Sequence, residues 1–245
     1  MMMSTARSSD RFASTRWSVV MQAATADPTD ASHALTELAT RYWYPVYAYV
    51  RRCGHAPAIA QDITRCFLGG LMQQFDDGIA RQPHGHFRRY LLHQLNAFLG
   101  GDWRDAVDND GTAELPAPVD LETRNERYNA SALSPEQAYE RSFALEVIAR
   151  ALRRLHSEAH QTGHLAMYRA LEPHMANDPA PGEYEAIAAQ LQTRPLALIV
   201  ALKRLRQRFR ELIGQELADT VTSAEDLAAE QAALHAVLSG MQTRA

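Results

Sequence analysis

The sequence predicts an all-α protein made of two small helical domains joined by an acidic linker. Alternation of β-branched and polar residues is almost absent, while Ala, Leu, Arg and Glu dominate and apolar residues recur every three or four positions. Residues 108–133 differ in kind, because they are rich in turn formers and hold six acidic residues against two arginines. The predicted divisions are a first domain at 10–107, the linker at 108–133, a second domain at 134–213 and a C-terminal helical extension at 214–245.

Four helices are expected in the first domain, at about residues 15–24, 31–53, 56–75 and 85–105. The second of them has a single apolar stripe, as a helix with one buried side requires. Its members are Leu35, Leu38, Tyr42, Val46 and Val50. Gly54 is expected to end this helix, because glycine accepts the left-handed conformation found just after many helices.

The second half opens on a strong helix-start signal. Ser134 can cap, Pro135 fits the first helical position, and Gln137 completes a capping box. Further helices are expected near 163–175, at 183–191, at 195–213 and at 223–240. The last of these begins at Ser223, with Asp226 as its capping partner.

Composition narrows the class of protein. The chain has 245 residues and a net charge of −4, and Lys203 is its single lysine, so nearly all positive charge is arginine. Two cysteines give no disulfide framework. We find no apolar signal segment at the start and no run long enough to span a membrane, so a soluble, cytoplasmic protein is expected, without membrane partners.

The segment 184–213 predicts a helix-turn-helix, with a short helix, the turn "QTR" and a longer helix. We expect Ile187, Ala188 and Leu191 to pack on Leu198, Val200 and Leu205. Basic residues on the longer helix suit contacts to DNA phosphates. The candidate DNA-binding residues here are Arg194, Lys203, Arg204, Arg206 and Arg208. The alternative is a solvated arginine face on a core helix, and the apolar front of this helix weakens the case for base-specific contacts.

A second group of basic and aromatic residues lies in "HFRRYLLHQLNAFLGGDWR". Unstacked bases stack on aromatic rings while arginines pair with phosphates, so the group suits single-stranded DNA. Its candidate contacts are Arg88, Arg89, Trp103 and Arg104. The alternative is that the rings belong to the core, which is the stronger interpretation for Phe87 and Phe98.

The sequence offers little for catalysis or metal binding. A zinc set could be assembled only from residues whose spacing matches no closed motif: Cys53, His55, Cys66, His84 and His86. No glycine-rich phosphate loop, nucleophile elbow or kinase signature occurs. We therefore expect no enzyme activity, no metal and no cofactor.

Taken together, these segments resemble a bacterial RNA polymerase sigma factor of the extracytoplasmic-function type. The resemblance covers residues 13–240, and the order and spacing of its segments carry it. They are "TRWSVV" (15–20), "RYWYPVYAYVRRCGH" (41–55), "AQDITRCF" (60–67), "HFRRYLL" (86–92), "SPEQAYERSFAL" (134–145) and "VALKRLRQRFREL" (200–212). The opening "TRWSVV" is similar to the branch associated with Ser/Thr protein kinases.

The resemblance implies a task for each part. Residues 10–107 would be sigma region two, which docks on the clamp coiled coil of the largest polymerase subunit and opens the minus-ten element. Residues 134–213 would be region four, on the minus-thirty-five element, and 108–133 would thread the polymerase. Asn96 joins the region-two DNA contacts, although the Arg-Asn pair frequent in the family corresponds here to Asn96-Ala97.

A further departure concerns the polymerase-docking helix. The family pattern is acidic there, whereas this chain keeps only Asp62 and adds Arg65. The stretch "QDITRCFLGG" sets Thr64 beside its apolar stripe, on a face expected to point outward. Phosphorylation adds about −1.5 to −2 charge, so Thr64 is predicted to be a site at which a Ser/Thr kinase restores polymerase binding. The alternative is a threonine that bonds to its own helix backbone or packs under a loop.

Two other classes remain open. One is a helix-turn-helix regulator that binds duplex DNA without polymerase. The other is an interaction module whose final acidic helix, at 223–240, holds a partner. Co-purification with core polymerase separates the first from a sigma factor, and deletion of residues 215–245 tests the second.

Overall fold

The computed structural model describes residues 28–76, 86–108, 120–129 and 133–242, and all regular secondary structure in these ranges is helical. The expectation of an all-α fold is therefore confirmed. The chain divides into two compact units: residues 1–146 with 217–245 (unit 1), and residues 147–216 (unit 2). The helix expected at 15–24 lies outside the described residues.

Unit 1 is built around α3 (Pro28–Arg52) and α4 (Pro57–Asp76), which pack together. Every side chain from Arg41 to Val50 is buried, so the apolar stripe widens into a fully covered segment. Tyr42 stacks on Phe143 with ring centroids 5.3 Å apart. Gly54 has φ +99°, in the left-handed region expected of the residue that ends α3.

The helix expected at 85–105 is two helices, α5 (Phe87–Gly100) and α6 (Trp103–Asp108). The break follows from Gly101, which has extended backbone angles and ends α5 with a hydrogen bond to the Phe98 carbonyl. Two consecutive glycines lower the helix propensity at this point. The result is that Trp103 begins a new helix.

The expectation of a solvated linker at 108–133 is wrong for its second half, because residues Leu121–Tyr128 form helix α7, packed on α3. Leu121 is buried, and Glu122 accepts two hydrogen bonds from Arg51, at 2.8 and 2.5 Å, and one from the Tyr47 hydroxyl. Glu122, one of the acidic residues that suggested a solvated chain, is thus paired with an arginine of α3. Arg124 of the same segment pairs with Glu146 of the following helix at 2.9 Å.

Helix α8 (Pro135–Gln161) begins as predicted. The Gln137 amide donates to the Ser134 hydroxyl, and the Gln137 side chain accepts from the Ser134 amide, which confirms the capping box. The unit boundary falls inside α8, after Glu146, rather than at residue 134. A continuous helix carries the chain from one unit to the next, so no composition shift marks the boundary.

Unit 2 consists of the rest of α8, α9 (Leu165–Leu171), the 3-10 turn η1 (Glu172–His174), α10 (Glu183–Gln190) and most of α11 (Pro195–Ala218). Its first core cluster joins α8, α9 and α11 through Ala151, Leu155, Ala159, Tyr168 and Leu212. The buried Glu216 of α11 pairs with Arg150 and Arg154 of α8, at 3.0 and 2.9 Å. Helix α11 therefore runs past the expected end at residue 213.

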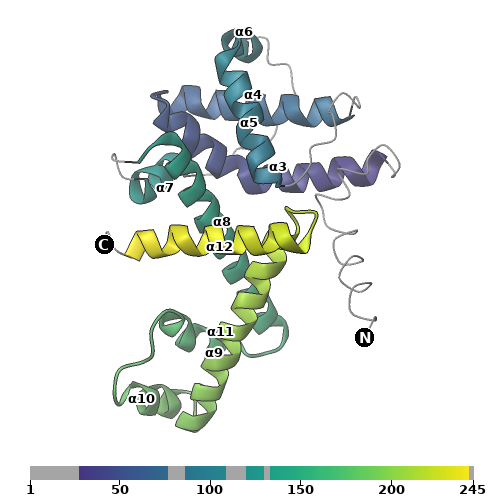
Figure 1. The fold of residues 1–245 in the computed structure, drawn as a ribbon. Coiled ribbons are helices and arrows are strands. Elements are labelled where there is room, and N and C mark those ends of the chain that lie inside the picture. The colour runs from purple at the N-terminus through teal and green to yellow at the C-terminus, as the bar shows by residue number, and fades with distance from the viewer. Residues whose placement is uncertain (1–27, 77–85, 109–119, 130–132, 243–245) are drawn as a thin grey trace. The chain divides into compact units, whose positions relative to one another are not determined.

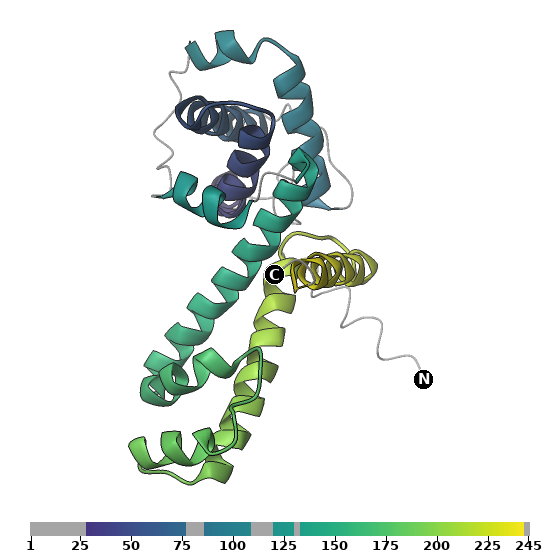
Figure 2. The ribbon, with the colours of Figure 1, turned by 90° about the vertical axis from the view of Figure 1, so that its left-hand side faces the viewer.

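The C-terminal extension expected at 214–245 belongs with unit 1 from residue 217 onward. Helix α12 (Ala224–Gln242) follows a cap in which the Asp226 amide donates to the Ser223 hydroxyl, as predicted. Helix α12 lies beside the start of α5 (Figures 1 and 2), and the Phe87 amide donates to the Thr220 carbonyl at 3.1 Å.

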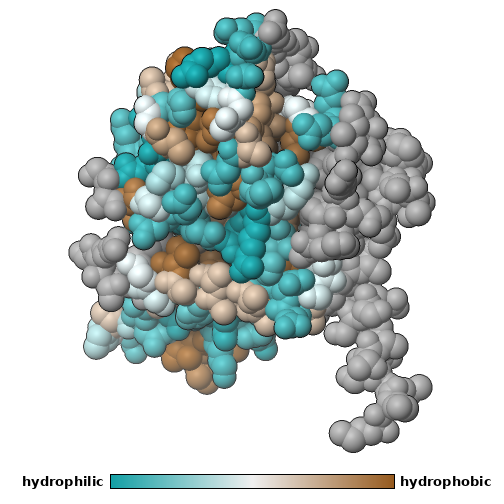
Figure 3. All heavy atoms as spheres, turned by 45° about the horizontal axis from the view of Figure 1, so that its top comes forward, coloured by the Kyte–Doolittle hydropathy of each residue, from teal (hydrophilic) through white to brown (hydrophobic). Residues whose placement is uncertain are grey.

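The described helices include none that is both long and apolar enough to cross a membrane. On the face drawn in Figure 3, hydrophobic residues form separate patches between hydrophilic ones. Such a mixture is ordinary for the surface of a folded protein.

Candidate nucleic-acid interface

Helices α10 and α11 form the short helix, turn and long helix predicted from the sequence. The turn closes with two hydrogen bonds, from the Thr193 amide to the Ala188 carbonyl at 2.9 Å and from the Gln192 amide to the Ala189 carbonyl at 3.4 Å. Gln192 has φ +51°, the left-handed conformation that such a helix end requires. Pro195 then begins α11.

A second apolar cluster fixes α10 against α11. It contains Leu171, Ile187, Ala188, Leu198 and Leu202, with Leu191 and Leu205 packed on its edge. The expected packing is confirmed except at Val200, which is 42% exposed. The outer side of the first turns of α11 is therefore apolar, because Leu196 and Ile199 are exposed as well.

Three of the five candidate DNA contacts in unit 2 are available to an anionic partner. Arg194, Lys203 and Arg204 are exposed, and none of the ion pairs found among the described residues involves them. Arg194 lies in the turn, whereas Lys203 and Arg204 follow two turns into α11. These side chains supply uncompensated positive charge at the front of the longer helix.

The other two candidates are paired within the unit. Arg206 binds Asp178 at 2.7 Å and donates to the His174 carbonyl at 2.7 Å. Arg208 forms a two-bond ion pair with Glu158, at 2.8 and 2.7 Å, and its guanidinium holds the pKa of the Glu158 carboxyl below the usual value. Contrary to expectation, both guanidinium groups connect α11 to the rest of unit 2.

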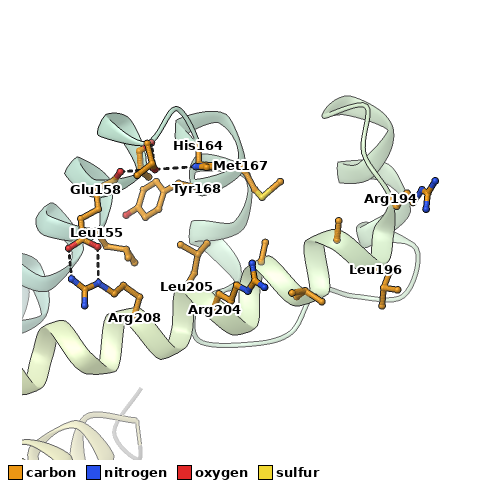
Figure 4. A pocket seen from close by; sticks show the side chains of 15 residues that line it. Leu155, Glu158, His164, Met167, Tyr168, Arg194, Leu196, Arg204, Leu205 and Arg208 are labelled. Atoms are coloured by element: carbon orange, nitrogen blue, oxygen red, sulfur yellow. Dashed lines mark hydrogen bonds and ion pairs between the residues drawn. The ribbon is translucent and has the colours of Figure 1, made fainter.

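A groove of about 710 Å³ runs beside this basic surface. In Figure 4, Met167 and Tyr168 of α9 face Leu205 and neighbouring residues of α11, and the Glu158–Arg208 ion pair closes one end. Arg194 and Arg204 also line the groove. Unit 2 thus presents apolar surface and free positive charge side by side.

Arg88, a candidate DNA contact of unit 1, is buried, so its expected exposure is wrong. Its guanidinium pairs with Glu230 of α12 at 3.1 Å and also with Glu140 of α8. His86 lies in the same cluster, with Nδ1 2.7 Å from Glu230 and Nε2 3.2 Å from Asp226. Sequence reasoning missed the cluster because Glu230 follows Arg88 by 142 residues, and no local pattern links them.

The remaining candidates in unit 1 lie at the surface. Arg89 and Asn96 on α5 are exposed, and the Asn96 side chain accepts a 2.6 Å hydrogen bond from the Tyr49 hydroxyl. Arg104 stacks over the Trp103 ring at 4.5 Å. Trp103 is half-buried, so its ring is only partly available for stacking on a base.

The expectation that Thr64 points outward is wrong. Its side chain is fully buried, and its hydroxyl donates to the Ala60 carbonyl at 2.7 Å. The apolar side of α4 is wide enough to include it, since Ile63, Cys66 and Phe67 are buried around it in sequence. The alternative of a threonine bonded to its own helix backbone is the one observed.

The exposed side of α4 carries almost no net charge. Asp62 and Arg65 form an ion pair at 3.1 Å, and both side chains are 38% exposed. The first turn contains no acidic residue, and Ile59 is exposed there. The one carboxylate expected to meet a basic polymerase surface is already neutralised by its neighbour.

Within the described ranges, no group of three or more His, Cys, Asp and Glu side chains could hold a metal ion. The fold and the site together define an all-α protein with a helix-turn-helix arrangement and a basic surface at its front. No protein-family model matches the chain, and no curated protein and no solved structure matches it significantly.

Proposed function

We propose that the protein is a sigma factor, which binds core RNA polymerase and directs it to promoter DNA. The proposal draws on the order of the sequence segments that resemble this family and on an all-α fold with a helix-turn-helix arrangement in unit 2. In this proposal α10 and α11 contact the minus-thirty-five element, and unit 1 contacts polymerase and the minus-ten element. Such a protein acts in the cytoplasm.

One observation carries the proposal: Arg194, Lys203 and Arg204 are exposed at the front of α11 and have no acidic partner among the described residues. Uncompensated arginine and lysine bind phosphates and release counterions, which supplies most of the sequence-independent affinity for duplex DNA. The chain as a whole is acidic, at −4, so this local cluster rather than net charge would guide DNA binding.

The apolar residues at the front of α11 suggest the kind of base contact. Leu196, Ile199 and Val200 have no side-chain donors or acceptors to read base edges. Apolar side chains in the major groove contact the thymine methyl group. We therefore expect the element contacted by α11 to be read mainly through thymines and DNA shape, with the cations fixing its register.

Phosphorylation of Thr64 by a kinase is not part of this proposal. The hydroxyl is buried and already donates a hydrogen bond to Ala60, so a kinase would have to unfold the start of α4 to reach it. Polymerase docking through α4 would instead use its exposed, nearly neutral side, which includes Ile59 and the Asp62–Arg65 pair.

In vitro transcription tests the proposal. The wild-type protein is added to core polymerase on genomic promoter fragments, and start sites that depend on it are mapped. We expect the triple variant Arg194→Ala, Lys203→Ala, Arg204→Ala to lose these transcripts, whereas Arg169→Ala, an exposed arginine on α9, keeps them. Absence of any transcript that depends on the wild-type protein would contradict the proposal.

A second candidate is a helix-turn-helix regulator that binds duplex DNA without polymerase. It is favoured by α4, whose docking segment, residues 59–66, has one carboxylate, and that carboxylate is paired with Arg65. Co-purification with core polymerase separates the two candidates. A regulator would bind its duplex site with unchanged affinity in the presence of core enzyme and would not co-purify with it.

A further inference from the structure

The attachment of α12 to unit 1 is unusually polar. Among the described side chains of Ala224–Gly240, only Glu230 and Leu234 are buried. These residues are four positions apart and so lie on the same side of the helix. One carboxylate and one leucine are the central anchors of a helix of nineteen residues.

The carboxylate of Glu230 ends in a cluster of charged groups at the start of α5. It accepts bonds from Nε and Nη2 of Arg88, at 3.1 and 3.2 Å, and lies 2.7 Å from Nδ1 of His86. Asp226, one turn earlier on α12, faces the other ring nitrogen of His86 at 3.2 Å.

We expect α12 to detach from unit 1 more easily than the other helices of the unit. A buried ion pair contributes little net stability, because the desolvation of both charges offsets their attraction. Leu234 is the single fully buried apolar side chain of the described part of α12, whereas Leu227, Val237 and Leu238 are only half-buried. The first half of α8, in contrast, buries Ala138, Tyr139, Phe143 and Ala144 in the same unit.

Arg88 would keep its place after α12 leaves. Glu140 of α8 binds the Nη1 side of its guanidinium, and the group lies 5.4 Å from the centre of the Phe143 ring. Loss of Glu230 would therefore free the Nε–Nη2 edge while the side chain stays oriented. This edge binds carboxylates and phosphates in the same two-bond geometry.

We propose that α12 is an internal cover on α5, in which the Glu230 carboxylate occupies the position that a phosphate of single-stranded nucleic acid takes on Arg88. Docking of α12 and binding of a strand to this face exclude one another. Arg89, the next residue of α5, is exposed while α12 is docked. The inference rests on the proposed function, in which unit 1 contacts the opened minus-ten element, and it adds an autoinhibited state to that function.

The test uses full-length variants with one or the other anchor weakened. Glu230→Gln removes the one of the two carboxylates on Arg88 that α12 supplies, and Leu234→Asn weakens the apolar anchor without touching the charged cluster. Glu225→Gln is the matched control, because Glu225 is an exposed carboxylate on the same helix. Hydrogen–deuterium exchange over residues 224–240 reports release of α12, and fluorescence anisotropy with a labelled single-stranded oligonucleotide reports binding.

We expect Glu230→Gln and Leu234→Asn to speed exchange in α12 and to raise oligonucleotide affinity about tenfold, the size of one charge-assisted contact. The Glu225→Gln control should match wild type in both measurements. Adding Arg88→Gln to Glu230→Gln should abolish the gain, because the gain passes through that guanidinium.

Two outcomes would overturn the inference. If neither variant speeds exchange in α12, the helix is a permanent part of unit 1. If α12 is released but affinity does not rise, its carboxylate does not compete with a strand. Failure of the proposed function can be told apart from failure of this inference. If affinity rises through Arg88 but no transcription depends on the protein and polymerase, the inference about α12 stands and the sigma-factor proposal is refuted.

Discussion

The hydroxyl of Thr64 donates a 2.7 Å hydrogen bond to the carbonyl of Ala60, one turn earlier on α4, and neither residue is exposed to solvent. Thr40 on α3 makes the same bond to the carbonyl of Thr36, at 2.8 Å, but its side chain is exposed. The two threonines thus share local chemistry and differ in burial. They form a matched pair for asking what a negative charge costs at each position.

Thr64→Asp is expected to lower the free energy of unfolding by about 3 kcal/mol or more, because an ionised carboxylate would be buried without a partner. Thr40→Asp should change it by less than about 1 kcal/mol, since its charge stays in water. Urea unfolding followed by tryptophan fluorescence measures both. Equal stability of the two variants would show that Thr64 is accessible and would restore it as a candidate phosphorylation site.

The exposed cations of α11 are expected to set the salt dependence of DNA binding. Each of Arg194→Ala, Lys203→Ala and Arg204→Ala should weaken binding to duplex DNA and reduce the slope of log affinity against log salt by about 0.9 for each phosphate that is no longer neutralised. Arg208→Ala should leave that slope nearly unchanged and lower stability instead, because Arg208 pairs with Glu158. Anisotropy titrations over a range of salt concentrations test this difference.

Packing of α7 on α3 is expected to weaken at low pH. Hydrogen bonds from Arg51 hold the pKa of Glu122 below its usual value, despite partial burial. A lowered carboxyl pKa stabilises the folded form at neutral pH, and this contribution disappears as the pH falls through the lowered pKa. Amide exchange in residues 121–128, corrected for intrinsic rates, should become faster as the pH is lowered from about 6 to about 3. In Glu122→Gln exchange should be fast at both pH values.

Gln192 is expected to be a strained position in the turn before α11. Its φ of +51° disfavours a residue with a Cβ atom, and it costs glycine nothing. Gln192→Gly should therefore raise the free energy of unfolding by up to about 1 kcal/mol. Gln190→Gly, in the last turn of α10, is the control and should lower it by about 1 kcal/mol. Thermal melting of both variants gives the comparison.

Features of the fold that depend on neighbouring residues could be predicted from the sequence. The caps at Ser134 and Ser223 involve side chains three residues away, and both occur as predicted. The start of α11 was also predicted from a single residue, Pro195. Periodic apolar spacing located most helices for the same reason, because it reflects one turn of the helix itself.

Features that depend on distant partners could not be predicted. The basic Arg88 is buried because Glu230 and Glu140 neutralise it, and the acidic Glu122 of α7 is held against α3 by Arg51. In both cases a charged residue suggested solvent, whereas the structure pairs it with a charge far along the chain. Arg206 and Arg208 are paired with acidic residues whereas Arg204 is exposed for this reason alone, although the sequence around the three gives no sign of the difference.

The position of Lys203 has a practical consequence. It is the only lysine of the chain, and its side chain is exposed on the helix that we propose contacts DNA. Amine-reactive dyes will therefore label a single side chain, at the surface of interest, with a free α-amino group as the other reactive amine. Crosslinkers that act through lysine will in turn capture bound DNA through this residue alone. A weak lysine-dependent crosslinking signal in cells would therefore not by itself show weak DNA binding, because a single side chain can carry the reaction.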